Sequence, residues 1–149
     1  MIERIIIATD GSRHSEHAAE MGIGLAKLSG GRVIALFVAD TGRYLPTIGD
    51  MGLSIPNGVM ESIRDEVLKF GRTAAGRVEE MAKKAGVQSE SAVVEGYPAE
   101  EILEAARNRS ADLVVMGSMG KTGLDRFLLG SVAEKVVKNS TTPVLIVHI

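Results

Sequence analysis

Glycine and small hydroxyl residues follow two of the most apolar runs in the chain. The segment Thr9–Ser12 comes directly after Ile5–Ala8, and four glycines spread over residues 117–130 follow a second such run. Glycine lets backbone N–H groups approach a ligand closely, and a helix that begins at Ser131 adds unpaired N–H donors and the positive end of its dipole. The spacing therefore predicts a phosphate-binding cradle, which the carboxylate of Asp10 faces across a cleft.

Two common phosphate-binding motifs do not match this region. Residues Gly120–Thr122 copy the end of GxxxxGK[ST], but the position of that motif's first glycine is Val115, inside an apolar run. No GxGxxG pattern follows Ile5–Ala8. We therefore expect the glycine cradle, rather than Lys121, to hold the phosphates.

The elements that must position these residues alternate between two periodicities. Runs that are apolar on both faces are typical of strands in parallel sheets. The chain has four of them, at Ile5–Ala8, Val33–Val38, Leu113–Met116 and Val144–Val147. The more polar run Ser89–Glu95 is expected to be an edge strand.

Helical patterns separate these runs, because apolar residues recur there at steps of three and four. They predict helices over 12–28, 59–85, 98–109 and 131–138. Ser12 and Ser15 are candidate caps of the first helix, and Pro98 opens the third at its first position. Gly71 and Gly76 interrupt the longest apolar stripe, which favours a helix lying across a sheet over a coiled coil.

This alternation predicts an α/β fold, an open five-stranded parallel sheet with helices on both faces, in one domain over residues 1–149. With the polar run at an edge, the strand order 3-2-1-4-5 fits. The order reverses direction between the first and fourth strands, and ligands bind outside the carboxyl ends of strands at such a switch point. It therefore brings Asp10 and the glycines to one crevice.

Composition excludes several classes of function. The 149 residues are 45% hydrophobic and 24% charged, which is typical of a globular domain. A net charge of −2 argues against broad nucleic-acid binding and against a polybasic membrane patch. The absence of cysteine excludes disulfides and thiolate chemistry and suits a cytoplasmic protein. No signal peptide or membrane span is expected.

One segment is too long for an ordinary loop. Residues 40–58 carry four glycines and two prolines and leave the carboxyl end of the second strand, on the side of the crevice. Loops of this length are usually functional or disordered. Two roles fit this segment, a lid and a mobile surface that contacts a partner, and the sequence does not choose between them.

The pattern Gly117-x2-Gly120-x9-Gly130-Ser131, with Asp10 at the end of the first strand, resembles the ATP-binding branch of the universal stress protein family. The resemblance covers the whole chain, including the stretches 111–118 and 142–147. It implies a Rossmann-like, adenine nucleotide alpha hydrolase-like fold and a cytoplasmic homodimer that binds ATP. Mg²⁺ should accompany the nucleotide, because several phosphate charges face few fixed cations here.

The resemblance also implies roles for individual residues. The base and ribose would face Ala8, Thr9, Asp10 and Val38; the ribose and α-phosphate would lie on Met116, Gly117 and Gly120; and the phosphates would receive N–H groups from Gly130, Ser131 and Val132.

Structural roles compete with these assignments. Ser131 and Glu134 form an S-x-x-E capping box, which by itself could explain the serine. Asp10 could cap the helix that begins near Ser12. Lys121 and Arg126 could be solvated loop charges instead of phosphate contacts. No metal site within the protein is expected, since histidines three residues apart are common on solvated helices.

The function that fits best is an ATP-binding regulatory or stress-response protein, a nucleotide-dependent switch with at most slow hydrolysis. Asp10 is the acidic residue placed at the crevice, and neither a histidine nor a base partner for Ser118 or Ser131 is identified, so no catalytic residue is assigned. The alternatives are a nucleotide-processing enzyme of related architecture, such as an ATPase or nucleotidyl transferase, and an interaction module without nucleotide.

The last strand predicts a homodimer. In the order 3-2-1-4-5, Val144–Val147 lies at an edge although it is apolar on both faces, and an unprotected edge of this kind is an aggregation hazard. A second copy of the chain is expected to cover it. Other protein partners are unknown, and neither nucleic acid nor membrane is expected.

Overall fold

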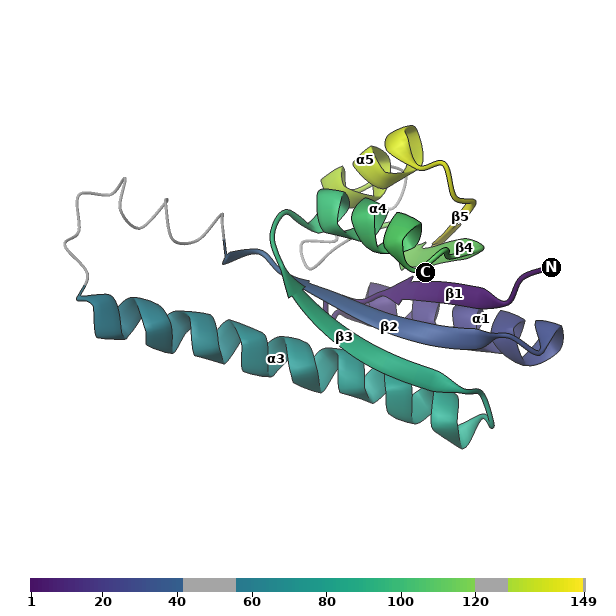
Figure 1. Cartoon of the computed structure of the whole chain (residues 1–149), viewed down its shortest axis with the longest axis horizontal. Helices are drawn as coiled ribbons and strands as arrows, with labels where there is room; N and C mark the ends of the chain where they lie inside the picture. Colours follow the sequence, from purple (N-terminus) through teal and green to yellow (C-terminus); the bar gives the residue numbers. More distant parts are fainter. Residues whose placement is uncertain (42–55, 120–128, 149) are drawn as a thin grey trace.

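The computed structural model describes residues 1–41, 56–119 and 129–148. Its strands form one sheet in the order β3-β2-β1-β4-β5, and every neighbouring pair is parallel (Figure 1). The strands are β1 (Arg4–Ala8), β2 (Arg32–Ala39), β3 (Ser89–Glu95), β4 (Leu113–Gly117) and β5 (Val144–Val147). The predicted fold class and strand order are confirmed.

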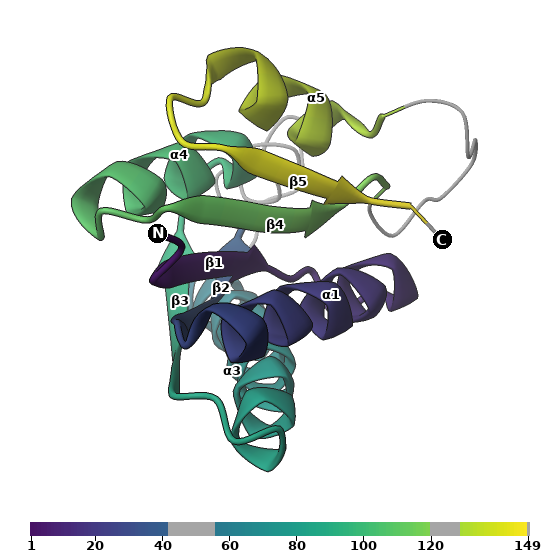
Figure 2. The same ribbon diagram turned by 90° about the vertical axis from the view of Figure 1, so that its right-hand side faces the viewer.

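Helices cover both faces of the sheet, as expected for a parallel sheet with right-handed crossovers. The helices described are α1 (Arg13–Ser29), α3 (Asn57–Lys84), α4 (Pro98–Asn108) and α5 (Ser131–Asn139). In Figure 2, α1 and α3 lie on one side of the strands, and α4 and α5 lie on the other. Within the described chain, none of the helices is both long and apolar enough to cross a bilayer.

Strand β1 lies at the centre of the sheet and is buried on both faces. Ile5 and Ile7 belong to the core cluster under α1 and α3, whereas Ile6 and Ala8 belong to the cluster under α4 and α5. The three isoleucines have no exposed surface. Because side chains in a strand alternate with a period of two, the residues just beyond β1 are also divided between the two faces.

The predicted ends of α1 and α4 agree with the structure to within one residue. Ser12 is the N-cap of α1, and its side chain accepts the N–H of Ser15. Gly30 ends the helix in the left-handed region, at φ 70°, which favours glycine. Pro98 occupies the first turn of α4, where its missing N–H costs nothing.

Helix α3 begins at Asn57, two residues before the predicted start, and its first half extends past the carboxyl ends of the strands (Figure 1). Gly71 has a packing reason, because a Cβ there would lie 2.5 Å from Cδ1 of Phe37 on β2. The glycine in the apolar stripe therefore lets the helix approach the sheet. Most of the predicted lid or partner segment, residues 42–55, lies outside the described residues.

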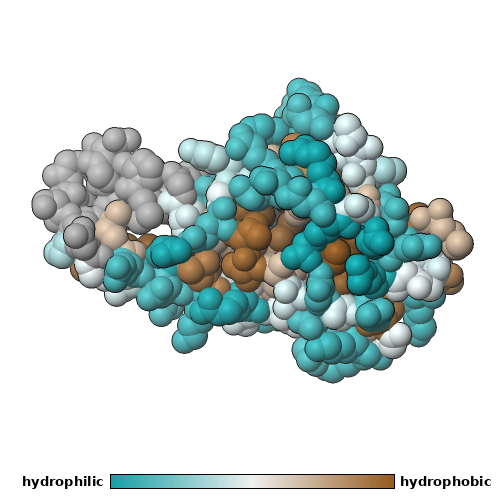
Figure 3. Space-filling view, viewed as in Figure 1, coloured by the Kyte–Doolittle hydropathy of each residue, from teal (hydrophilic) through white to brown (hydrophobic). Residues whose placement is uncertain are grey.

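The edge of the sheet that β3 forms is bonded to a helix. Strand β3 is an edge strand as predicted, and its carboxyl end is tied to α3 by the guanidinium of Arg64, which donates to both oxygens of Glu95. This hydrogen bond holds the pKa of Glu95 below its usual value. The middle of β3 is half-buried, and Figure 3 shows apolar atoms between hydrophilic rims on the face of the molecule that this edge borders.

The carboxylate of Asp112 joins β4 to β1 at the amino ends of these strands. Oδ2 of Asp112 accepts the backbone N–H groups of Glu3 and Arg4, each at 2.9 Å, just before β4 and at the start of β1. These bonds, with that from Arg4 first, lower the pKa of Asp112. The two central strands are thereby joined at the end opposite to the crevice.

Candidate functional site

The chain leaves β1 and β4 toward opposite faces of the sheet. After β1 it enters α1, on the α1/α3 face, and after β4 it continues to α5, on the α4/α5 face (Figure 2). The two strands are neighbours, so their carboxyl ends form a switch point of the kind at which open α/β sheets bind ligands. The predicted site residues are distributed around these two ends.

The floor of the site is apolar and lies on the α4/α5 face. Ala8 and Met116 belong to the core cluster under α4 and α5, and the partly buried Val38 and Val132 pack against it. Ala8 and Met116 are almost fully buried, with 8% and 6% of their surface exposed. Three of the ten predicted residues are therefore brought to one face by the alternation of side chains along three neighbouring strands, and α5 adds a fourth.

The amino end of α5 stands beside this floor. Gly130 is the N-cap, and its N–H donates to the carbonyl of Ser118 at 2.7 Å, which ties the helix start to the exit of β4. Among the described residues, no side chain caps the helix, and its first N–H groups have no intrahelical partner. An uncapped helix N-terminus is a binding site for anions.

The capping-box interpretation of Ser131 is wrong. Ser131 is the first helical residue and not the N-cap, and the Glu134 carboxylate accepts instead from Lys138 at 2.8 Å. That hydrogen bond lowers the pKa of Glu134. Gly130 has φ −62°, so the backbone does not require glycine at this position. The exposed hydroxyl of Ser131 is left without a capping role.

Gly117 ends β4 against the first turn of α1. A Cβ at this position would lie 3.0 Å from the carbonyl oxygen of His14 and 3.2 Å from its Cβ. Close packing therefore gives a structural reason for this glycine. Gly120 lies outside the described residues, as do Lys121 and Arg126.

Asp10 is half-buried in the connection between β1 and α1. Its Oδ1 accepts the N–H of Ser12 at 2.9 Å, a turn that the aspartate makes with its own backbone. Asp10 is therefore not the cap of α1, because Ser12 holds that position. Gly11 follows at φ 80°, and a Cβ there would lie 2.7 Å from Cζ of Phe70 on α3.

Thr9 turns its side chain away from the apolar floor. It is 7% exposed, and its Oγ1 lies 3.1 Å from Oγ of Ser15 on α1. The same Oγ1 accepts the N–H of Gly11 at 3.2 Å. Thr9 thus reaches the crevice only through its main chain, since its hydroxyl lies among residues of the α1/α3 face.

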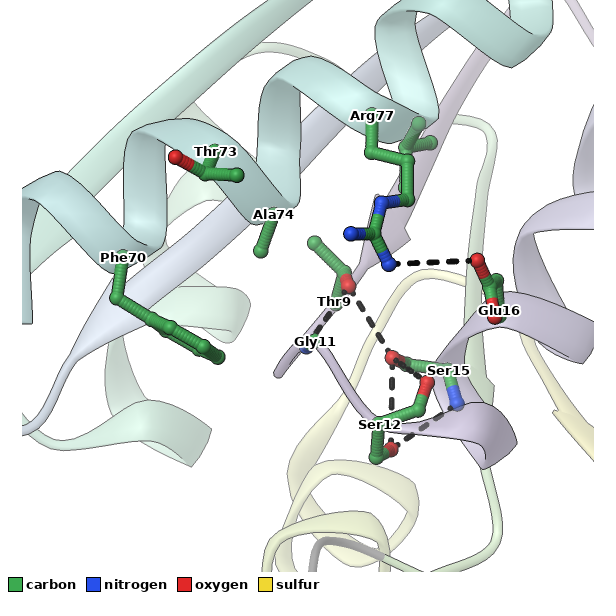
Figure 4. A pocket seen from close by; sticks show the side chains of 10 residues that line it. Thr9, Gly11, Ser12, Ser15, Glu16, Phe70, Thr73, Ala74 and Arg77 are labelled. Atoms are coloured by element: carbon green, nitrogen blue, oxygen red, sulfur yellow. Dashed lines mark hydrogen bonds and ion pairs between the residues drawn. The ribbon is translucent and has the colours of Figure 1, made fainter.

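A small cavity lies behind this connection, between the start of α1 and the middle of α3 (Figure 4). Its volume is about 50 Å³, which is space for very few water molecules. Hydroxyl groups line one wall, Phe70 and Ala74 line the other, and Nη1 of Arg77 lies 3.6 Å from Oε1 of Glu16 nearby. The cavity is too small for a nucleotide.

Sequence reasoning missed two residues of this region. Ser15 was expected only as a candidate cap, yet it is 5% exposed and joins Thr9 to the helix. Its position three residues before the buried Ala18 was the available signal. Phe70 appeared only as one residue of a long stripe, and no local pattern indicates its contact with Gly11. Among the described residues, no group of three or more acidic or histidine side chains could hold a metal ion.

Comparison with known proteins identifies the family of this chain. The family model of the universal stress protein family matches residues 1–148. Universal stress protein MJ0531 of Methanocaldococcus jannaschii is 42% identical over 149 residues, which are 99% of this chain and 82% of the relative.

Two solved structures extend the comparison. MJ0577 of the same organism superposes with a TM-score of 0.82 at 29% identity, covering 99% of this chain and 96% of that one. A universal stress protein in complex with cAMP superposes with a TM-score of 0.65, also at 29% identity, covering 99% and 97%. The sequence match extends over nearly the whole chain, and the fold matches with it. The chain therefore belongs to the universal stress protein family.

Proposed function

We propose that this protein binds ATP in the crevice between β1 and β4 and acts as a nucleotide-dependent switch in a stress response. One observation carries the proposal: an apolar floor and an uncapped helix N-terminus lie side by side at the switch point, on the same face of the sheet. The floor suits a flat apolar base, and the helix N-terminus suits phosphate. The structural relative in complex with cAMP supports an adenine nucleotide as the ligand.

The residues proposed for the site are those that the family resemblance implies. The proposed nucleotide-binding set is Ala8, Thr9, Asp10, Val38, Met116, Gly117, Gly120, Gly130, Ser131 and Val132. The base would lie toward Ala8 and Val38, the ribose toward the Asp10 carboxylate, and the triphosphate toward the start of α5. Mg²⁺ would bind with the nucleotide and neutralise part of the phosphate charge.

A nucleotide-processing enzyme is the second candidate. Nδ1 of His14 is buried and has no hydrogen-bond partner among the described residues. The main chain of His14 lies close to Gly117 at the end of β4. An imidazole in such a place is a candidate base. Repeated turnover of ATP by the wild type, lost in His14→Gln while ATP still binds, would favour an enzyme over a switch.

Calorimetry with ATP and Mg²⁺ tests the binding site. Gly130→Val places a side chain at the start of α5, where φ −62° is allowed for valine. We expect it to weaken ATP binding at least a hundredfold while circular dichroism shows an unchanged fold. Lys121→Ala should cost less, at most the roughly 1.5–3 kcal/mol of a charged hydrogen bond.

Two results would contradict this account. If the wild type does not bind ATP, the proposed function is wrong. If Lys121→Ala abolishes binding while folded Gly130→Val retains it, the phosphates lie elsewhere. Mass spectrometry of nucleotide carried through purification would identify the natural ligand.

We also infer that the active form is a cytoplasmic homodimer through β5. Among the described strands, β5 pairs only with β4, and its four apolar residues are half-buried in one copy of the chain. A second copy would cover this edge. Sedimentation should give a dimer at micromolar concentration, and a monomer there would remove this part of the proposal.

A further inference from the structure

Two hydroxyl groups behind the candidate site, those of Thr9 and Ser15, are the centre of one connected network (Figure 4). Oγ of Ser15 lies 3.1 Å from Oγ1 of Thr9 and donates to the carbonyl of Ser12 at 2.8 Å. Oγ1 of Thr9 accepts the N–H of Gly11 at 3.2 Å. The N–H of Ser12 donates in turn to the carboxylate of Asp10 at 2.9 Å. The network thus joins the end of β1, the connection and the first turn of α1.

We propose that Thr9 and Ser15 are positioning residues, whose hydroxyl pair holds the Asp10–Ser12 backbone so that the Asp10 carboxylate faces the ribose and base of the bound nucleotide. The inference rests on the proposed ATP-binding function. It assigns to Thr9 a role through Asp10 and not a side-chain contact with the ligand.

The direction of the Thr9 side chain supports this assignment. Ala8 belongs to the core cluster under α4 and α5, whereas Thr9 bonds to α1 on the other face. Both hydroxyl residues are nearly buried, Thr9 at 7% and Ser15 at 5% exposure. A buried polar group costs free energy unless it is hydrogen-bonded, so the pair constrains where the connection can lie.

The same network limits the freedom of Asp10. The carboxylate is oriented by the N–H of Ser12, and the carbonyl of that same residue is held by Ser15. Gly11 is fixed between the Thr9 hydroxyl and the ring of Phe70, which leaves no room for a Cβ. Removing the Thr9 hydroxyl releases the Gly11 N–H and leaves Ser15 with one partner fewer, so the turn that orients Asp10 loosens.

The test compares Thr9→Val, which keeps the side-chain shape and removes the hydroxyl, with Thr9→Ser, which keeps the hydroxyl. Calorimetry would be run with ATP and, separately, with inorganic tripolyphosphate, which has neither ribose nor base. We expect Thr9→Val to weaken ATP binding about tenfold, the effect of losing one well-aimed hydrogen bond. Tripolyphosphate binding should change less than twofold, and Thr9→Ser should bind ATP within about threefold of the wild type.

Two further measurements separate positioning from general stability. In an Asp10→Ala background, Thr9→Val should cause no additional loss of ATP affinity, since the group that it aims is absent. Amide hydrogen exchange without ligand should be faster at Gly11 in Thr9→Val. Thr73→Val is the matched control, because Thr73 lines the same cavity but its hydroxyl donates only to the carbonyl of Lys69 in its own helix.

Each outcome decides a different question. Equal losses from Thr9→Val with and without Asp10, or unchanged ATP affinity in a folded Thr9→Val protein, would overturn the positioning role and leave ATP binding intact. Ser15→Ala, which breaks the same pair from α1, must reproduce the result if Thr9→Val does not fold. A wild-type protein that fails to bind ATP would remove the proposed function and this inference with it.

Discussion

The two faces of the sheet end differently at the carboxyl edge. On the α4/α5 face, the last side chains of three strands are apolar and lie beside a helix N-terminus that no side chain caps within the part of the chain that the structure describes. On the α1/α3 face, the polar groups of the β1–α1 connection are bonded to one another around a cavity of about 50 Å³. On the α4/α5 face, the N–H groups at the start of α5 are therefore available to a ligand. On the α1/α3 face, the hydrogen-bonding groups instead hold the β1–α1 connection in place.

This difference shows how one short segment supplies two kinds of residue. Ala8 and Thr9 are adjacent in sequence, yet their side chains belong to opposite faces because β-strand side chains alternate. A glycine then carries the chain through φ 80°, which few other residues adopt. The candidate binding face and its support are therefore built from consecutive residues and can be altered separately.

The largest effect is expected from overpacking the supporting face. A Cβ at Gly22 of α1 would lie 2.8 Å from Cδ1 of Ile7 and 3.5 Å from Cβ of Val115. Gly22→Leu should therefore lower the free energy of unfolding by about 1–3 kcal/mol, measured by urea denaturation. The affinity of the folded protein for ATP should stay within twofold.

Gly24, two residues along the same helix, provides the matched control. Nothing lies within 4 Å of a Cβ at that position, so Gly24→Ala should raise stability by up to about 1 kcal/mol. If Gly22→Leu instead leaves stability unchanged, then α1 does not pack against the sheet at Gly22 as closely as the structure shows.

A smaller effect on binding is expected from filling the apolar floor. Ala8 is only 8% exposed, so Ala8→Leu should lower stability by overpacking and, in the protein that remains folded, weaken ATP binding about tenfold, or 1.4 kcal/mol. Tripolyphosphate binding should change little, since the phosphates lie toward α5. Calorimetry with both ligands measures the difference.

The control changes an alanine elsewhere on the same face. Ala92 lies on the edge strand β3, in the same cluster but two strands from β1. Ala92→Leu should leave the affinity for ATP within twofold of the wild type. Equal losses from both substitutions would place the base away from Ala8.

The smallest effect is expected at the opposite end of the strands, where no ligand is proposed. Asp112→Asn keeps the shape of the side chain but removes the charge that accepts the N–H groups of Arg4 and Glu3. Because these bonds lower the folded-state pKa of Asp112, the ionised group stabilises the fold above the unfolded pKa of about 3.9. That contribution is lost as the pH falls through the lowered pKa.

Thermal unfolding from pH 7 to pH 3 measures this contribution. Asp112→Asn should melt below the wild type at pH 5–7, and the difference should shrink as the pH falls below about 4. The affinity for ATP at pH 7 should be unchanged. A difference that grows in acid would contradict the sign of the pKa shift.

Sequence patterns were sufficient for the architecture, and through it they predicted where the candidate site lies. The doubly apolar runs, such as Ile5–Ala8, can be covered only from both faces, and the polar run Ser89–Glu95 fits only an edge. Together they led to the order 3-2-1-4-5, and the order placed the crevice beyond β1 and β4. Each step depends on local composition and on rules of chain connection, which a single sequence carries.

The tertiary structure decided which polar group serves which purpose. The S-x-x-E pattern at Ser131 is compatible with a capping box, but packing of the β4 exit made Gly130 the cap by drawing its N–H to Ser118. The contact of Phe70 with Gly11 joins residues 59 positions apart, and no local pattern encodes it. Hydrogen-bond partners and close approaches depend on how whole helices and strands pack together. The sequence shows which polar groups are available, but not which of them bond to one another.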